Sequence, residues 1–413
     1  MNTQQYDPIE VRKQRGLQIA KTSRIVRTEK GYWKVPSQSG SGYYLIKSVK
    51  GEVKCNCPDY ETRRCKCKHI WAIELIVTQQ VDNEGNITIT QTKRITYAQD
   101  WKSYNLAQTK EKEYFMKLLA DITNRINNQT YTFGRPENNL GDTIYSMIFK
   151  VYSTFSSRRF TTDMKIAKSQ GKIESITPRS SMSDYFNKED ITPILANMVT
   201  LTALPLKEVE KDFAIDSTGF GTSNFQRWFS FKHGKEICSR KWVKCHFVCG
   251  VRTNIIPRVK ITSEFDNDCP QLSELYNNTK EYFNMEELSG DKAYLSIKNL
   301  ELIENNGTRA LIPFKSNNTP NKKGAVWKKL YHFFALHNEE FLQSYHKRSN
   351  AESTVMMIKS KFGDAVRSKN WTAQVNEVLC KVICHNICCV IMESFCLGIK
   401  PDFSIEEKIQ YER

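Results

Sequence analysis

The sequence predicts an α/β (α+β) fold in which a mixed sheet flanked by helices follows a small ββα unit and a helical region. Three observations lead to this prediction. From about residue 208, three β-rich segments precede alternating helices and strands, as in a mixed sheet covered by helices. Residues 99–205 carry apolar side chains at helical spacing. Residues 31–77 combine two short strand patterns, a group of cysteines and a histidine, and a helix pattern.

Length and charge narrow the class of protein. At 413 residues the chain is too long for one typical domain, and its net charge is +16. Residues 1–80 hold 15 Lys and Arg against 7 Asp and Glu, so their excess of +8 is half of the total. This balance excludes an acidic solvating tail and favours a polyanionic partner.

The chain is not expected to enter a membrane or an oxidising compartment. The N-terminus has no apolar run, so it does not resemble a signal peptide. The most apolar stretch, 379–399, contains Lys381, His385, Asn386 and Glu393, which predicts a buried helix. Thirteen cysteines without a signal peptide indicate reduced thiols, used for metal binding or buried in a core.

Composition shifts divide the chain into five expected parts. These are a Cys/His unit at 1–80, a polar linker at 81–98 with some strand character at Ile87–Thr90, a mostly helical DNA-binding or assembly region at 99–205, an α/β domain at 206–395 and a C-terminal tail at 396–413. Turns are expected at Ser39–Gly42 and at Gly134–Pro136. The cationic and aromatic segment Lys150–Tyr152 fits either an ordinary amphipathic helix with a basic end or a DNA-contacting surface.

The cysteines and histidine of the first unit have the spacing of a metal site. Cys55 and Cys57 are followed ten residues after Cys57 by Cys67 and His69. Zinc prefers four tetrahedral thiolate and imidazole ligands, often supplied as two close pairs on separate backbone segments. A strand end that carries Cys-x-Cys and a helix start that carries Cys-x-His would meet this need.

Together with the upstream Trp33-x-Val35 and Tyr44, this pattern resembles the SWIM zinc finger over about residues 31–77. The resemblance implies one structural Zn²⁺ and a module that binds DNA or protein. Cys65 is an extra thiol that competes with Cys67 for one ligand position, although only Cys67 gives Cys-x-His. Four cations surround the site and fit either phosphate contact or a solvated loop: Arg63, Arg64, Lys66 and Lys68.

Three carboxylates are expected at the ends of structural elements in the α/β domain. Asp216 closes an apolar strand, Asp291 lies in the segment Gly290–Tyr294, and Glu352 lies on an expected helix from about Tyr345 to Phe362. On a regular helix, about 100° per residue places Tyr345, Arg348, Glu352 and Lys359 in one stripe of roughly 60°. An apolar face lies beside this stripe. A surface ladder of ion pairs would give a similar pattern.

The spacing Tyr345-x2-Arg348-x3-Glu352-x6-Lys359 resembles the Y-R-E-K signature of DDE transposases from prokaryotic insertion sequences. Ala214–Phe220 resembles the first-Asp strand of that family, and Gly290–Tyr294 resembles its second-Asp segment. The resemblance extends over about 208–390 and implies a ribonuclease-H-like fold. Because only about 60 residues separate Asp291 from Glu352, no large inserted β-domain is expected between them.

The resemblance also implies a chemistry. Asp216, Asp291 and Glu352 would hold two Mg²⁺ or Mn²⁺ ions, which suit oxygen-only ligands, for cleavage of DNA at element ends and transfer of the freed strand into target DNA. Tyr345, Arg348 and Lys359 would contact backbone phosphates. The expected partners are the terminal inverted repeats and target DNA, bound by a homodimer or higher oligomer in the prokaryotic cytoplasm near the nucleoid.

Two other functions remain open from the sequence. One is a catalytically silent DNA-binding or regulatory protein derived from a transposase, although a binding module has no need for all three acidic residues. The other is a related nuclease that cleaves DNA without joining it. The sequence predicts a structural or capping role for Asp268 and a position in the sheet for His246. Cys380, Cys384 and Cys388 are expected to form the core stripe of a helix.

Overall fold

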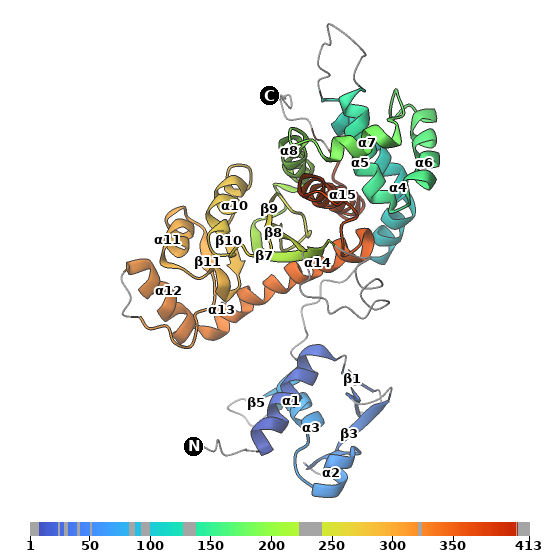
Figure 1. The fold of residues 1–413 in the computed structure, drawn as a ribbon. Coiled ribbons are helices and arrows are strands. Elements are labelled where there is room, and N and C mark those ends of the chain that lie inside the picture. The colour runs from blue at the N-terminus through green and yellow to red at the C-terminus, as the bar shows by residue number, and fades with distance from the viewer. Residues whose placement is uncertain are drawn as a thin grey trace, which may run out of the picture. The chain divides into compact units, whose positions relative to one another are not determined.

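The computed structural model describes most of the chain as two compact units, residues 1–98 and 99–413 (Figure 1). The described residues are 8–23, 25–28, 32–38, 42–49, 52–81, 87–91, 100–126, 138–222, 242–320, 324–401 and 403. The expected turn residues Ser39–Ser41 and Gly134–Pro136 and most of the expected C-terminal tail lie outside these ranges.

The first unit is built on an antiparallel sheet with the strand order β1-β2-β3-β4. Its strands are β1 (Val26–Arg27), β2 (Trp33–Pro36), β3 (Tyr43–Val49) and β4 (Glu52–Cys55). Three helices accompany the sheet: α1 (Pro8–Thr22), α2 (Pro58–Arg63) and α3 (Lys68–Ile76). The strands β5 (Val77–Val81) and β6 (Ile87–Gln91) form a separate antiparallel pair. β6 lies within the segment 81–98 that was expected to be a linker, whereas β5 lies almost entirely before it.

Helix α1, which the sequence patterns did not predict, packs closely against α3. A Cβ atom at Gly16 would lie 2.6 Å from Cβ of Trp71 and 2.8 Å from the carbonyl oxygen of Lys68. Glycine at this position therefore permits a close approach of the two helices that no other residue would allow. Ile19 of α1 is fully buried in the core of the unit.

The second unit begins with a layer of helices. These are α4 (Trp101–Thr123), α5 (Leu140–Ser153), α6 (Ser157–Ser169), α7 (Arg179–Phe186), α8 (Ile191–Ala203) and the 3-10 helix η1 (Leu204–Leu206). The mostly helical character expected for 99–205 is present in the described part of this segment. Asp100, Asn139 and Ser156 cap α4, α5 and α6 by accepting hydrogen bonds from first-turn N–H groups, which explains where those helices begin.

A five-stranded mixed sheet with the order β11-β10-β7-β8-β9 follows. Strands β7, β8 and β9 form an antiparallel meander, and β10 and β11 pair in parallel on the other side of β7. This is the ribonuclease-H-like arrangement, so the expected fold class is confirmed. The strands are β7 (Asp212–Gly221), β8 (Trp242–Gly250), β9 (Arg258–Ser263), β10 (Glu287–Gly290) and β11 (Arg309–Leu311).

Helices follow and connect these strands. They are α10 (Gln271–Lys280), η2 (Lys292–Tyr294), α11 (Ile297–Asn305), α12 (Ala325–Leu336), α13 (Asn338–Tyr345), η3 (His346–Arg348), α14 (Ser349–Phe362) and α15 (Trp371–Leu397). In the described residues between Asp291 and Glu352, the only strand is β11, which belongs to the main sheet.

Helix α15 is the central helix of the second unit. It contacts α8, α4, α5, α7, α14 and β8, so it joins the helical layer to the sheet (Figure 1). By length and composition it is the one described helix that would suffice to cross a membrane, yet 72% of its apolar window is buried inside the protein. Its polar residues are also accommodated there: the amide of Asn386 donates to the carbonyl oxygens of Val199 and Ile256. These contacts are those of a core helix.

Candidate active site and metal centre

The register of the central strands brings the first two carboxylates together. Gly290, the last residue of β10, pairs with Ile215 of β7, so Asp291 and Asp216 are the next residues on two adjacent parallel strands. Neighbouring strands lie about 4.8 Å apart, which sets the two residues side by side. The expectation that Asp216 ends its strand is wrong, because β7 continues to Gly221 and Asp216 pairs with Phe247 of β8 in the middle of the strand. A Cβ atom at Gly290 would lie 2.9 Å from Cγ2 of Ile215. The absence of a side chain there allows this close approach directly beside the site.

The two aspartates differ in their environment. The side chain of Asp216 is only 20% exposed and accepts a hydrogen bond of 2.8 Å from the N–H of Ser217. Burial raises the pKa of Asp216; the Ser217 N–H and Arg348 oppose this shift, and the nearby Asp291 carboxylate adds to it. Asp291 is half-buried and accepts a hydrogen bond from the N–H of Ala293, which starts η2.

Arg348 joins the third carboxylate to the first. Its Nη1 donates to Oδ2 of Asp216 at 2.8 Å, and its Nη2 donates to Oε1 of Glu352 at 3.3 Å. Glu352 is in the first turn of α14, and its side chain is 69% exposed. The guanidinium thus lies between two of the three predicted metal ligands and supplies the positive charge that they need.

The prediction of a single helix from Tyr345 to Phe362 is wrong, because this segment contains the end of one helix, a 3-10 turn and a second helix. Helix α13 ends at Tyr345, the 3-10 helix η3 covers His346–Arg348, and α14 begins at Ser349. The 3-10 turn directs adjacent side chains to different carboxylates: Lys347 contacts Asp212 and Glu287, whereas Arg348 reaches the site. The one regular stripe calculated from 100° per residue is therefore interrupted.

Two other members of the expected stripe lie at different distances from the carboxylates. The ring centroid of Tyr345 is 6.0 Å from the guanidinium carbon of Arg348. Burial raises the pKa of Tyr345, which Arg348 opposes. Lys359 lies seven residues beyond Glu352, about 10 Å along α14, with its Nζ 5.6 Å from the ring centroid of Phe220. The structure groups Tyr345, Arg348 and Glu352 but not Lys359.

Several polar side chains lie near Asp216, and the sequence patterns did not identify them as a group. Burial raises the pKa of Tyr294, and the carboxylates of Asp268, Asp216 and Asp291 raise it further. Asp268 lies 3.1 Å from Nδ1 of His246 and 3.1 Å from Nζ of Lys244. Burial lowers the pKa of His246, which favours the neutral ring. In the structure, His246 of β8 pairs with Ser217, next to Asp216; no local sequence pattern indicates this contact.

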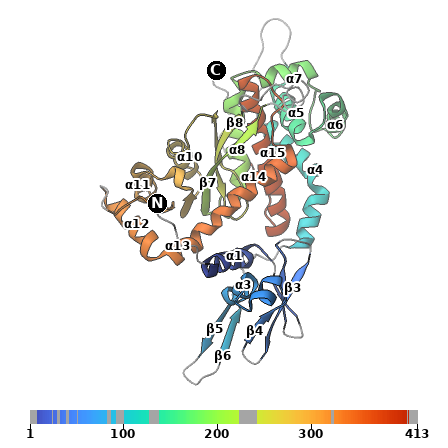
Figure 2. The ribbon, with the colours of Figure 1, turned by 60° about the horizontal axis from the view of Figure 1, so that its bottom comes forward.

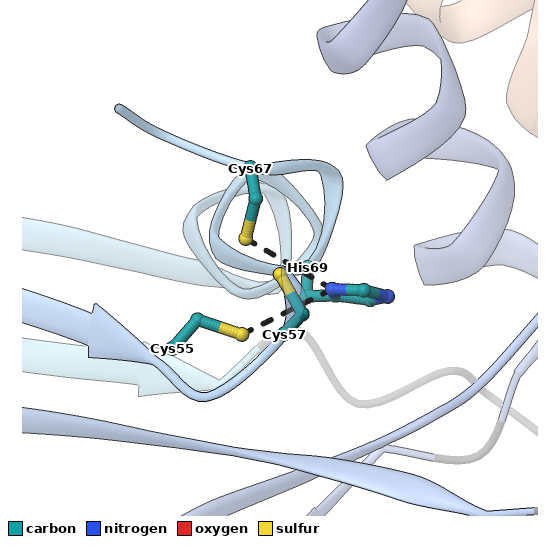
Figure 3. Close-up of side chains that lie close together, drawn as sticks. All are labelled: Cys55, Cys57, Cys67 and His69. Atoms are coloured by element: carbon teal, nitrogen blue, oxygen red, sulfur yellow. Dashed lines mark hydrogen bonds between the residues drawn. The ribbon is translucent and has the colours of Figure 1, made fainter. Parts of the chain in front are cut away.

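In the first unit, four buried side chains form a compact group (Figure 3). One ligand atom from each of Cys55, Cys57, Cys67 and His69 lies within 4.8 Å of the others. Nδ1 of His69 is 3.9 Å from both the Cys55 and the Cys67 sulfur atoms. Two ligands of a tetrahedral zinc ion are separated by about 3.5–3.8 Å, so this donor set fits the metal.

Local structure explains how this group forms. Cys55 ends β4, Cys57 precedes α2, and Cys67 and His69 lie at the start of α3. Cys67 accepts a hydrogen bond from Cys55, which lowers the pKa of Cys67 to about 4, whereas contact with Cys67 raises the pKa of Cys55. A thiolate is the form of cysteine that binds metals.

The extra thiol and the surrounding cations lie outside this group. Cys65 is half-buried and is not among the four clustered residues. Arg63 lies 3.7 Å from Asp59, Lys66 forms an ion pair with Glu74 at 2.8 Å, and Lys68 donates to Gln38 at 2.9 Å. The guanidinium carbon of Arg64 lies 6.0 Å from the ring centroid of Tyr60. Arg63, Arg64 and Lys66 are exposed and Lys68 is half-buried, and their contact with phosphates stays a prediction.

Comparison with known proteins concerns mainly the second unit. Residues 207–387 match the family model described as the transposase DDE domain, a segment that contains Asp216, Asp291 and Glu352. A cryo-EM structure of the piggyBac transposase synaptic complex with hairpin DNA aligns with 70% of this chain and 77% of that chain, at 9% sequence identity and a TM-score of 0.32. No curated protein matches the chain.

Proposed function

We propose that the protein is a DDE transposase of the prokaryotic insertion-sequence type, which cleaves DNA at the ends of its element and joins the freed strand to target DNA. The observation that carries the proposal is the register of β7 and β10, which sets Asp216 beside Asp291, with Glu352 held to Asp216 through Arg348. The match of residues 207–387 to the transposase DDE domain supports it.

The three carboxylates fit Mg²⁺ or Mn²⁺, because they offer oxygen ligands only and carry more negative charge than Arg348 neutralises. Two such ions would activate an attacking oxygen and stabilise charge on the leaving oxygen. Asp216 is held rigidly by its central strand and by the N–H of Ser217. Asp291 is oriented by the N–H of Ala293, and Glu352 is exposed and free to adjust.

Arg348 has two successive roles in this proposal. In the metal-free protein it compensates the charge of Asp216 and Glu352. Once cations hold those carboxylates, the guanidinium becomes available for bidentate contact with a backbone phosphate. Tyr345 supports the guanidinium from one side, and Lys359 contacts a phosphate farther along the DNA.

For the first unit we propose a SWIM-type zinc finger. Cys55, Cys57, Cys67 and His69 would hold one structural Zn²⁺, which fits the buried thiolate and imidazole donors. The exposed cations beside the site support a contact with DNA. The working form would be a homodimer or higher oligomer on DNA, in the cytoplasm of a prokaryotic cell near the nucleoid.

The test uses purified full-length protein and a labelled duplex that carries the inverted repeats flanking its gene. With Mg²⁺ or Mn²⁺, we expect strand cleavage at the repeat ends, followed by joining to a second duplex. Asp216→Asn, Asp291→Asn and Glu352→Gln should each abolish cleavage while DNA binding persists. Glu208→Gln is the matched control, because this carboxylate is 88% exposed.

Binding without cleavage by the wild-type protein would favour a catalytically silent DNA-binding protein. Cleavage without joining would favour a nuclease. Wild-type rates in the Asp216→Asn variant would overturn the assignment of the active site.

A further inference from the structure

A cavity of about 630 Å³ opens in the second unit at the end of α14 that is opposite Glu352. It lies among α5, the starts of α6, α7 and α15, and the loop 363–370 that joins α14 to α15. Five of its lining residues are cations: Lys150, Arg179, Arg367, Lys369 and Lys381. Glu377 is the only carboxylate among the lining residues.

The single carboxylate is already fully used by the protein. Oε1 and Oε2 of Glu377 each accept a hydrogen bond of 3.0 Å from the N–H of Arg367. Oε2 also accepts from the N–H and the hydroxyl of Ser368, at 2.9 and 2.7 Å. Glu377 therefore shapes the loop and leaves the cavity with a net positive charge.

The cations have two different roles. Nζ of Lys381 is buried and donates to the carbonyl oxygens of Phe362, Gly363 and Ala365 at 2.8–2.9 Å, so it holds the loop in place. Arg179, Arg367 and Lys369 are exposed, and none forms an ion pair within the described part of the chain. Nη1 of Arg367 donates to the carbonyl oxygen of Phe155 at 3.2 Å, so Arg179 and Lys369 are the two exposed lining cations that can contact a ligand directly.

The lining also offers neutral donors and an apolar wall. Hydroxyl and amide groups come from Ser156, Ser157, Ser183 and Asn187. No side chain caps the first turns of α7 and α15, which start at the cavity, so their N–H groups add to the positive potential. Val151, Phe186 and Phe362 provide apolar surface. Several donors beside an apolar wall suit a phosphate joined to a sugar better than a carboxylate.

The position of the cavity relates it to the carboxylates. Ten residues of α14 separate Glu352 from Phe362, which is about 15 Å at 1.5 Å per residue. Figures 1 and 2 show α14 passing β7 and reaching α15. The bridge between Gly221 and Ala365 ties the end of β7 to the same loop. DNA rises about 3.4 Å per base pair, so 15 Å corresponds to about 4–5 base pairs.

We infer that this cavity binds a backbone phosphate of the DNA substrate about 4–5 nucleotides from the phosphate that is cleaved at the carboxylates. The inference rests on the proposed function, because it takes the carboxylates as the cleavage site. The DNA would follow α14, with Lys359 between the two contacts. Arg179 and Lys369 make the direct phosphate contacts, and the cavity thereby fixes which bond reaches the carboxylates.

Salt dependence of binding tests the charge of the cavity. The double variant Arg179→Gln/Lys369→Gln is compared with Lys207→Gln/Lys328→Gln, which removes the same charge from exposed positions outside the cavity. The probe is a fluorescently labelled duplex of fixed sequence, titrated at several NaCl concentrations. The slope of log K against log salt should fall by about 1 in the cavity variant, because one phosphate contact is lost at about 0.9 per contact. Equal slopes in the two variants would overturn the inference.

The position of the phosphate that the cavity binds is tested by replacing single phosphates of the terminal-repeat duplex with neutral methylphosphonates. Wild-type protein should lose affinity when the replaced phosphate lies about 4–5 nucleotides from the cut, and the cavity variant should be insensitive there. Equal sensitivity of both proteins at every position would contradict the inference.

Free phosphate is the other source of the same ligand chemistry. Inorganic phosphate is added at constant ionic strength, and its binding to the wild-type protein is compared with its binding to the cavity variant. If it binds the wild-type protein alone and leaves the affinity for DNA unchanged, the cavity is a small-anion site and the inference fails. These readouts measure binding, so they are separate from the cleavage lost in Asp216→Asn. An error in the assignment of the cavity and an error in the assignment of the active site would therefore give different results.

Discussion

Replacing Arg348 with glutamine isolates the charge balance of the carboxylate site. The change removes the 2.8 Å hydrogen bond to Asp216 and the 3.3 Å hydrogen bond to Glu352. The neighbouring Lys347 is a matched control, because it also contacts two carboxylates, Asp212 at 2.7 Å and Glu287 at 3.2 Å. The side chain of Arg348 is 18% exposed, whereas that of Lys347 is 41% exposed.

The difference in exposure determines the expected magnitudes. A partly buried hydrogen bond between charged groups contributes about 1.5–3 kcal/mol, and its loss leaves Asp216 beside Asp291 without compensation. An exposed ion pair contributes about 0–1 kcal/mol. At about 2 °C per kcal/mol for a unit of this size, Arg348→Gln should lower Tm by about 3–6 °C and Lys347→Gln by less than about 2 °C.

The assay is thermal unfolding of the full chain, first without divalent ions and then with millimolar Mg²⁺. Mg²⁺ should reduce the deficit of Arg348→Gln, because it brings positive charge to the same carboxylates, and should leave the smaller deficit of Lys347→Gln unchanged. Equal losses of Tm in the two variants without Mg²⁺ would refute this reasoning. A deficit of Arg348→Gln that Mg²⁺ does not change would refute it as well.

Three further predictions concern other parts of the molecule. Cys67→Ser should reduce bound zinc from about one ion per chain to none by metal analysis, whereas Cys65→Ser should retain it, since only Cys67 belongs to the buried cluster. DNA affinity at constant ionic strength should fall as pH rises above about 8, because burial and Arg367 lower the pKa of Lys150 to about 8; a flat profile from pH 7 to 9 would contradict this. Gly290→Ala should reduce stability by about 1–3 kcal/mol in calorimetry, because its Cβ would lie 2.9 Å from Ile215, while Gly221→Ala, with 3.8 Å to its neighbour, should be nearly neutral.

Much of the fold was predictable from periodicity. The apolar run that ends at Asp216 became part of the central strand β7, because a short continuous apolar run marks a buried strand locally. The neighbouring strand β10, which ends directly before Asp291, was implied only by the family resemblance. The long apolar stretch 379–399 became part of the core helix α15. Helix α1 was missed, because its close packing on α3 depends on Gly16 and is not visible in its own pattern of apolar residues.

The site was less predictable because it depends on contacts between distant segments. The 3-10 turn at His346–Arg348 arises where Lys347 and Arg348 reach different carboxylates, a choice that no helical wheel contains. The contact between Asp268 and His246, with the buried Tyr294 near Asp216, brings together distant segments and has no local signature. The Cys/His spacing, by contrast, was sufficient to identify the four residues that cluster, because the pairs lie on short connected elements.

The central claim is that Asp216 binds a metal ion that is needed for strand cleavage. The most direct test is to replace Asp216 and ask whether a different metal ion restores cleavage. A thiolate binds Mg²⁺ poorly and accepts Mn²⁺ better, because it is a softer ligand than a carboxylate. If Asp216 is a metal ligand, Asp216→Cys should not cleave terminal-repeat DNA in Mg²⁺ and should partly recover in Mn²⁺, whereas Asp216→Ala should stay inactive in both. Wild-type cleavage by either variant in Mg²⁺, or equal recovery of both variants in Mn²⁺, would contradict the account.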